Sequence, residues 1–196
     1  MKYIAIVGTN ASFSYNRKLL WYMKNHFSSI AELEIVEIAD VPLFSEDFDE
    51  LPAALKSIAA QIVKSDGVIF STPEYDHAIT AALKSLLEWL SWQNLKVLTE
   101  KPAMIVGTSL GNLGTVFAQE NLRQILNSPG IDAFVLPSNQ FLLGQAEQAF
   151  DEKGNLIHPK TIDWLEHCFA NFNKYVHSVK NLNFDDVDAT TGASEE

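Results

Sequence analysis

Apolar residues along the chain fall into two kinds of spacing, one typical of strands and the other of helices. Short continuous or alternating apolar runs predict buried strands at residues 2–8, 33–38, 66–71, 103–108 and 133–136. Apolar residues three and four positions apart predict helices at residues 15–27, 52–63, 78–90 and 115–126. The clearest helix is the last, whose apolar face is formed by Ile162, Leu165, Phe169, Phe172, Val176 and Val179.

Strands and helices that alternate along a chain predict an α/β fold, with a parallel sheet covered by helices on both faces. Five strands in 196 residues favour the flavodoxin-like, doubly wound order 2-1-3-4-5. In that order a ligand binds at the switch point between strands 1 and 3, so we expect a site built from the loops after strands 1, 3 and 4. We expect one domain over residues 1–180, followed by a flexible acidic tail at 181–196.

Composition and charge narrow the class of protein. Hydrophobic residues make up 47% of the chain and charged residues 20%, which is typical of a globular protein without membrane spans. A net charge of −11 disfavours nucleic acid and anionic membranes as partners, and is explained either by solubility or by an acidic face for a redox partner. The single cysteine, Cys168, excludes an internal disulfide framework and is interpreted as a core residue; we expect no metal site. With no signal peptide visible, we expect a cytoplasmic protein.

The loop at residues 8–16, after the first strand, is rich in hydroxyl and amide side chains. It leads into a helix N-terminus, where free N–H groups and the positive end of the helix dipole favour a phosphate. An ordinary capped loop, with Ser14 as the cap, explains the same residues equally well. The loop is neither a GxGxxG nor a Walker A motif.

Two further loops supply the rest of the expected site. The loop after the third strand contains Pro73 and the flat ring of Tyr75, and the loop at 107–115 has three glycines that allow close approach to a planar ligand. One sheet edge therefore combines a loop suited to a phosphate, an aromatic ring and a glycine-rich loop. This combination suits a flavin mononucleotide.

With these motifs in sequence order, the chain resembles the NAD(P)H-dependent FMN reductase family, which includes chromate, quinone and azo-dye reductases. The resemblance covers residues 1 to about 180. It rests on four segments: GTNASFSYNRKL, PLFSED, TPEYDHAITAALKSLLEWLS and KPAMIVGTSLGNLGTVFAQENLRQIL. The resemblance implies a non-covalent FMN, NADH or NADPH as electron donor, and a homodimer or homotetramer. Its interface is expected near Trp89 and Trp92; the alternative interpretation of these two residues is that they belong to the core.

The resemblance also implies roles for individual residues. The FMN phosphate is expected at Thr9, Asn10, Ser14 and Asn16; the flavin ring at Pro73, Glu74, Tyr75 and Asp76; and its pyrimidine edge at Ser109, Gly111 and Asn112. The family's loop arginine is replaced by Ala11, so amides, hydroxyls or Arg17 are expected to balance the phosphate charge. Because the cofactor carries out the chemistry, no catalytic side chain is nominated. His77 is weighed as a proton donor against a merely structural role.

The tail carries one further motif. Residues 188–194, DATTGAS, resemble the D-x-x-[ST]-G-A-[ST] target of flavin transferase, which implies covalent attachment of a second FMN to Ser194. Three functions stay open at this stage: a free-standing reductase of flavins, quinones or similar small acceptors; an electron-delivery subunit for a partner reductase; and a non-enzymatic flavodoxin-type carrier.

Overall fold

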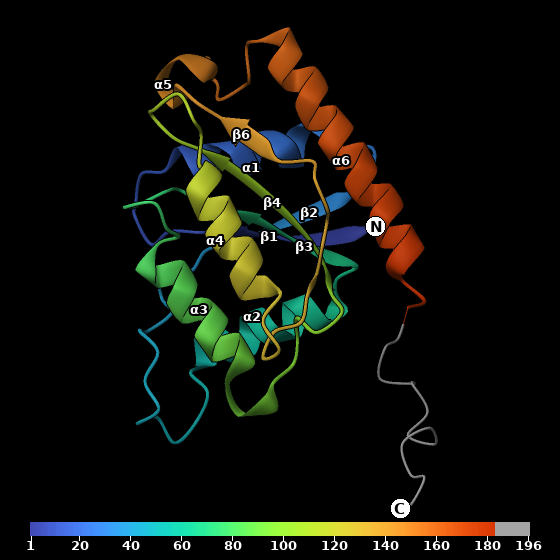
Figure 1. Cartoon of the computed structure of the whole chain (residues 1–196). Helices are drawn as coiled ribbons and strands as arrows, with labels where there is room; N and C mark the ends of the chain where they lie inside the picture. The colour runs from blue at the N-terminus through green and yellow to red at the C-terminus, as the bar shows by residue number, and fades with distance from the viewer. Residues whose placement is uncertain (183–196) are drawn as a thin grey trace, which may run out of the picture.

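The computed structural model describes residues 1–182, and Figure 1 shows a central sheet between two layers of helices. The core of the sheet is formed by β1 (Lys2–Val7), β2 (Glu32–Val36), β3 (Gly67–Ser71) and β4 (Pro102–Thr108). All strand pairs are parallel, and the order is β2-β1-β3-β4-β5. The predicted flavodoxin-like order is therefore confirmed.

The fifth position of the sheet is interrupted, which the sequence did not reveal. β5 (Phe134–Val135) pairs with the start of β4, and β6 (Phe141–Leu143) pairs with its end at Val106–Thr108. A run of three residues is too short to give a recognisable strand pattern, so only the first half of this position was predicted.

Two core clusters divide the helices between the two faces of the sheet. α1 (Tyr15–His26) and α6 (Pro159–Val179) pack with Ala5, Ile69 and Met104 on one face. α2 (Ala53–Lys64), α3 (Ala81–Ser91) and α4 (Val116–Leu126) pack with Ile4, Phe70 and Ile105 on the other. Neighbouring strand residues thus point to opposite clusters, as a pleated sheet covered on both faces requires.

α3 begins at Ala81, three residues later than its apolar spacing predicted. Asp76 and His77 both have positive φ, 51° and 60°, and the backbones of Tyr75 and Ala78 bond to each other in both directions at 3.0 Å. This two-residue turn matches the hairpin geometry that requires positive φ at both central positions. Thr80 then caps the helix by accepting a hydrogen bond from the Leu83 amide at 3.0 Å.

Two residues singled out in the sequence lie in the core. Cys168 is fully buried on the inner face of α6. Trp89 is fully buried against Phe44 and Phe48, and its Nε1 donates to the Pro42 carbonyl. Trp89 thus belongs to the core of this chain, and an interface between copies near Trp92 stays a prediction.

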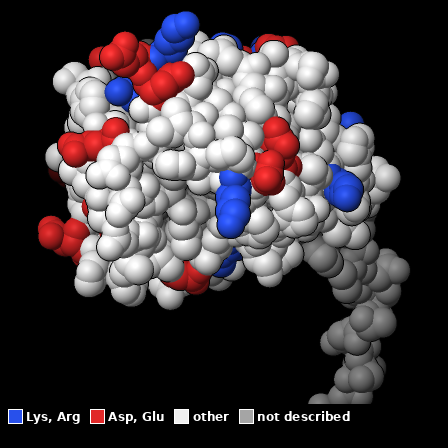
Figure 2. All heavy atoms as spheres, turned by 90° about the horizontal axis from the view of Figure 1, so that it is seen from above, with Lys and Arg blue, Asp and Glu red and all other residues white. Residues whose placement is uncertain are grey.

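The short helix α5 (Ala146–Ala149) joins β6 to the segment before α6. Figure 2 views the molecule from the side on which α5 and α6 lie in Figure 1; charges of both signs are scattered there over a largely uncharged surface. No helix within residues 1–182 combines the length and apolar character needed to cross a membrane.

Candidate functional site

The loops after β1, β3 and β4 meet at one edge of the sheet and enclose a cavity of about 430 Å³, here called the switch-point cavity. This volume is in the usual range for small-molecule sites. The cavity is lined by Phe13, Ser14, Tyr15, Asn16, Pro73, Glu74, Tyr75, Thr108, Ser109, Leu110 and Gly111.

Seven of the twelve residues expected at a non-covalent flavin line this cavity: Ser14, Asn16, Pro73, Glu74, Tyr75, Ser109 and Gly111. Five do not line it: Thr9, Asn10, Arg17, Asp76 and Asn112. Thr9 is buried and its hydroxyl accepts from the Ala11 amide at 3.2 Å, so it shapes the loop. Ser194 lies outside the described residues.

Asn16 connects three elements rather than presenting a free amide. Its Nδ2 donates to the Thr108 carbonyl at 2.9 Å, and its Oδ1 accepts from the Thr108 amide and the Ser71 hydroxyl, each at 3.0 Å. The residue is 2% exposed. These bonds join the start of α1 to the ends of β3 and β4, which fixes the relative positions of the three loops.

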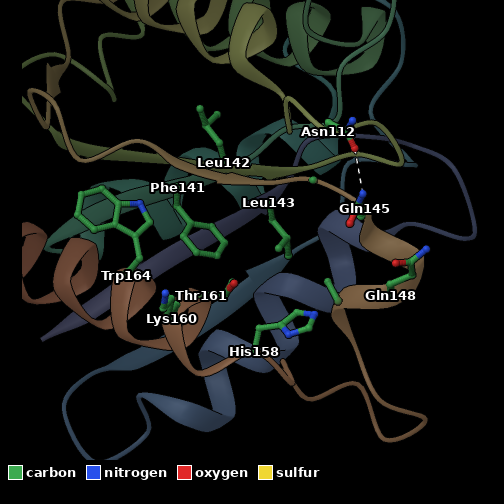
Figure 3. Close-up of a pocket in the computed structure, with 12 residues that line it drawn as sticks. Asn112, Phe141, Leu142, Leu143, Gln145, Gln148, His158, Lys160, Thr161 and Trp164 are labelled. Carbon is green, nitrogen blue, oxygen red and sulfur yellow. Dashed lines mark hydrogen bonds between the residues drawn. The ribbon is translucent and has the colours of Figure 1, made fainter.

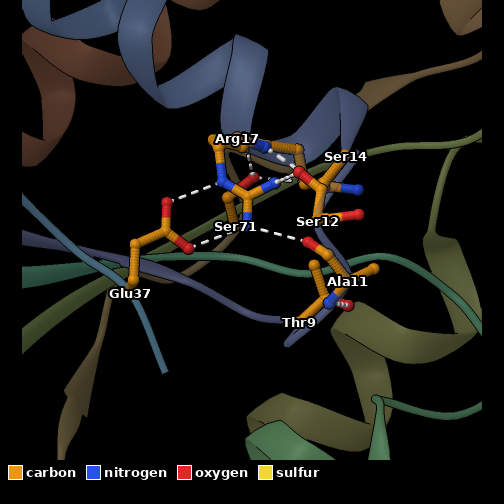
Figure 4. Close-up of polar contacts among 8 residues, drawn as sticks. Thr9, Ala11, Ser12, Ser14, Arg17, Glu37 and Ser71 are labelled. Atoms are coloured by element: carbon orange, nitrogen blue, oxygen red, sulfur yellow. Dashed lines mark hydrogen bonds and ion pairs between the residues drawn. The ribbon is translucent and has the colours of Figure 1, made fainter. Parts of the chain in front are cut away.

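The Arg17 guanidinium bonds to Glu37 on one side and to the backbone of the first loop on the other (Figure 4). Its Nε and Nη2 donate to the two carboxylate oxygens of Glu37 at 2.6 and 2.8 Å. Its Nη1 and Nη2 also donate to the carbonyls of Ser12 and Ala11, both at 2.9 Å. The bond to Glu37 is the main reason that the pKa of Arg17 is raised, so the guanidinium stays charged.

The contacts of Arg17 orient the peptide groups of the loop. In a trans peptide the C=O and the following N–H point in opposite directions, and the described chain has no cis peptide bonds. Carbonyls 11 and 12 face the guanidinium, so the amides of Ser12 and Phe13 face away from it. At the end of the loop, the Ser14 hydroxyl caps α1 by accepting from the Arg17 amide at 3.3 Å.

Glu74 connects the second loop to the third. One of its carboxylate oxygens accepts from the amides of Phe117 at 2.9 Å and Ala118 at 3.1 Å, both in the first turn of α4. A carboxylate at a helix N-terminus satisfies amides that have no partner within the helix. Thr115, at the N-cap of α4, makes no such side-chain bond, so Glu74 takes this role from outside the helix.

The third loop, after β4, is closed by a hydrogen bond between Ser109 and Gly114, and it leaves open space beside Gly111. The Ser109 hydroxyl donates to the Gly114 carbonyl at 2.5 Å, and the space where Gly111 would carry a Cβ is open. The buried Thr108 Oγ1 has no hydrogen-bond partner, although Thr108 lines the cavity. A buried polar atom without a partner is rare in native proteins and points to a missing ligand or water.

The cavity residues that the sequence did not reveal are mostly apolar. Phe13, Tyr15 and Leu110 line the cavity, and Phe13 and Leu110 are 61% and 63% exposed. Large apolar side chains in loops at the ligand-binding edge of a parallel sheet are the signal that could have identified them. Thr108, at the end of β4, was within the predicted strand but was not nominated.

Two other chemical possibilities gain no support from the geometry. The ring of His77 stacks on Phe117 at 4.4 Å, which gives it a packing role beside the cavity. Among residues 1–182, no three His, Cys, Asp or Glu side chains lie close enough together to hold a metal ion.

Comparison with known proteins gives consistent matches. The model of a family described as NADPH-dependent FMN reductase matches residues 1–148. A protein of Vibrio ruber, NADH:(hydroxy)cinnamate reductase subunit CrdA, is 47% identical over 93% of this chain and 90% of its own length. The NADH-dependent flavin reductase subunit 2 of Lactobacillus johnsonii is 45% identical over 92% of this chain and 100% of its own length. The structure of FerB, a flavoenzyme NAD(P)H:(acceptor) oxidoreductase from Paracoccus denitrificans, superposes with a TM-score of 0.81 at 24% identity, covering 90% of this chain and 97% of its own.

Proposed function

Because the chain belongs to the NADPH-dependent FMN reductase family and is an NAD(P)H-dependent flavin oxidoreductase, we propose that it is the electron-delivery subunit of a two-component reductase. The observation that carries the flavin chemistry is the switch-point cavity, with its amide-lined loop, its open glycine and the unpartnered Thr108 hydroxyl. The role as a subunit is supported by two relatives that are nearly half identical and are both named as subunits.

The residues of the cavity fit FMN without a lysine or arginine in its lining. We assign the phosphate to the first loop, with the Ser12 and Phe13 amides and the Ser14 hydroxyl as donors at the N-terminus of α1. Thr9, Asn10, Asn16 and Arg17, which were expected to bind the phosphate directly, are assigned here to the shaping of this loop.

The flavin ring is assigned to the other two loops. Pro73, Glu74 and Tyr75 line one side of the cavity, and Thr108, Ser109 and Gly111 line the other. We keep Asp76 as the turn residue that positions Tyr75, and Asn112 as the neighbour that supports Gly111.

FMN, when bound, supplies the redox chemistry, because it takes a hydride from a reduced nicotinamide and releases electrons singly or in pairs. The chain binds and orients, and the exposed rings of Phe13 and Tyr75 offer an apolar surface for a second flat molecule. No lysine or arginine lines the cavity, and the Lys18 ammonium beside it lies over the rings of Phe13 and Tyr15, 5.1 Å from each centroid. Since no cation in the lining is placed to bind a 2′-phosphate, we propose NADH as the preferred donor.

The test of this function is rapid mixing of the FMN-loaded chain with NADH or NADPH while flavin absorbance is followed. We expect bleaching with both and a higher kcat/KM for NADH. Reduced chain mixed with quinones or free flavin then separates the two enzyme hypotheses, because a free-standing reductase turns these acceptors over rapidly and a delivery subunit does so only slowly. Absence of bleaching with both donors contradicts the oxidoreductase assignment for this cavity.

We also propose that Ser194 carries a second, covalently attached FMN, which relays electrons to the partner subunit. The support is the complete match of residues 188–194 to the flavin transferase target. Coexpression with the transferase should increase the intact mass by one FMN less one water. Ser194→Ala should abolish this increase, whereas Thr190→Ala, at an unspecified position of the motif, should keep it. An unmodified wild-type chain under these conditions contradicts the covalent flavin.

A further inference from the structure

A second cavity, of about 470 Å³, lies between β6, α5 and the first turn of α6 (Figure 3). We call it the α6 cavity. It shares no lining residue with the switch-point cavity, but Asn112 on its wall directly follows Gly111 of that site. Apart from Asn112, none of its lining residues was nominated for the flavin site.

The charge of the α6 cavity is opposite to that of the chain. None of its twelve lining residues is Asp or Glu, although the sequence has 25 acidic and 14 basic residues. Lys160 and His158 line it, together with the amide side chains of Asn112, Gln145 and Gln148. No ion pair of Lys160 occurs among the described residues. The lining therefore offers a cation and several hydrogen-bond donors with no carboxylate to compete for them.

An aromatic wall lies at one end of the same cavity. The Trp164 indole is 44% exposed, and it is held by a bond from its Nε1 to the Gln140 carbonyl at 2.9 Å and by stacking on His167 at 5.1 Å. Phe141 and Leu143, both nearly fully buried, line the cavity beside it (Figure 3). An exposed but fixed ring is a surface for a flat ligand that loses little side-chain freedom on binding.

We propose that the α6 cavity binds a flat aromatic ring that carries an anionic group, with the ring against Trp164 and the anion at Lys160. Two sources share this chemistry: a free aromatic carboxylate, and the adenosine phosphate part of a nucleotide. Neither Trp164 nor Lys160 belongs to the proposed flavin site, so the inference stands whether or not that site holds FMN.

The α6 cavity is tied to the loop that borders the switch-point cavity. The Gln145 amide donates to the Gly111 carbonyl at 2.9 Å, and the Gln145 side chain donates to Asn112 Oδ1 at 3.0 Å. At Gly144, a Cβ would lie 2.6 Å from the Asn112 carbonyl oxygen, so the two segments are in direct contact. A ligand that displaces Gln145 therefore moves the 109–114 loop, and by linkage each ligand changes the affinity for the other by the same factor.

Titration calorimetry of the full-length, FMN-loaded chain tests the proposal, and repeating it without FMN separates this site from the flavin assignment. The probes are 2-naphthoate, its neutral amide 2-naphthamide, and adenosine 2′,5′-bisphosphate. We expect saturable binding of at least one anionic probe, with 2-naphthamide binding more weakly than 2-naphthoate by roughly fivefold or more. The anion that binds identifies the source.

Two variants and two matched controls locate the binding. Lys160→Gln should weaken the anionic probe by roughly fivefold or more, and Trp164→Leu should weaken the same probe through loss of the ring contact. Lys174→Gln, further along α6, and Trp21→Leu, an exposed tryptophan on α1, should leave the affinity unchanged. The proposal is overturned if neither anion shows saturable binding up to about 5 mM. It is also overturned if neither Lys160→Gln nor Trp164→Leu weakens the binding that is seen.

Discussion

Arg17 shows how a cation can support a phosphate site without lining it. Its guanidinium is neutralised by Glu37 on one side and bonded to two loop carbonyls on the other. The charge is thereby used to fix the direction of two peptide groups, whose amides face away from the guanidinium. The loop can hold an anion through oriented dipoles, although Ala11 stands where the family's arginine is expected.

This role predicts an effect that depends on the phosphate of the ligand. Arg17→Ala should raise the Kd of FMN by roughly tenfold, because the loop amides lose their fixed direction, while the Kd of riboflavin, which lacks the phosphate, should change by less than about twofold. Quenching of flavin fluorescence measures both constants.

Two further variants control this experiment. Lys24→Ala removes the same charge from the last turn of α1 and should leave both constants unchanged. Glu37→Gln should give a smaller FMN effect than Arg17→Ala, because an amide still accepts one guanidinium bond. Equal weakening of FMN and riboflavin by Arg17→Ala would show a general structural defect rather than loop orientation.

Cys168 is fully buried, and desolvation raises the pKa of its thiol to about 12. The reactive species is the thiolate, so at pH 8 almost no reactive form is present in the folded chain. We expect no labelling by a disulfide reagent such as DTNB in the native protein, and one equivalent after unfolding in denaturant. Stoichiometric labelling of the native protein would contradict the buried environment of Cys168.

At this scale, the sequence predicts residue types better than residue partners. Ser14, Pro73 and Gly111 could be nominated because loop chemistry and strand ends are local signals. The pairing of Arg17 with Glu37, twenty residues away, depends on the packing of α1 beside the segment after β2 and leaves no local pattern. The hydrogen bonds of Asn16 to Thr108 and Ser71 could not be predicted from the sequence, because these residues also lie far from Asn16 along the chain.

At the scale of elements, the start of α4 depends on a residue from another loop. Glu74 bonds two first-turn amides of α4, so the second and third loops are held at a fixed distance. Because the capping carboxylate comes from another loop, the stability of α4 depends on the conformation of that loop.

Removal of this cap should therefore cost stability. Glu74→Ala leaves two amides without their protein partner and should lower the free energy of unfolding by about 1 kcal/mol, measured by urea denaturation. Glu74→Gln, which keeps an acceptor but loses the charge, should cost less. The control is Glu152→Ala, at an exposed acidic residue in the segment before α6. This substitution should change the free energy of unfolding by no more than about 0.5 kcal/mol. A Glu74→Ala cost no larger than that of the control would show that water replaces the cap.

The elements themselves were largely predictable, and the exceptions have local causes. The apolar face of α6 repeats over 21 residues and leaves little ambiguity. The late start of α3 follows from positive φ at Asp76 and His77, which hydrophobic spacing does not record. β6 has only three residues and is defined by its partner β4, so it is a product of tertiary pairing.

At the scale of the whole molecule, the two cavities and the two core clusters are built from residues 1–182, the part of the chain that the structure describes. Among the described residues 1–182, those that line the two cavities lie between Phe13 and Trp164, and the two core clusters end at Val176. The parallel order of the strands brings the three loops to one edge, which is why the place of the site followed from topology alone.

This arrangement predicts that the tail is dispensable for the first flavin. A chain ended after Leu182 should keep the Kd of non-covalent FMN within about twofold of the full-length value, measured by fluorescence quenching. The same chain should lose covalent flavin and, by the proposed relay, electron delivery to a partner. A large loss of FMN affinity on truncation would show that the tail belongs to the first site.

The interrupted fifth position of the sheet has a consequence for how copies of this chain meet one another. A long, straight outer strand presents unpaired N–H and C=O groups that can recruit a strand from another molecule. Here the outer edge is divided between β5 and β6, with Pro137 and the positive φ of Ser138 and Asn139 between them. An incoming strand could pair with only two or three residues before meeting this break, so the edge is a poor template for aggregation between copies of the chain.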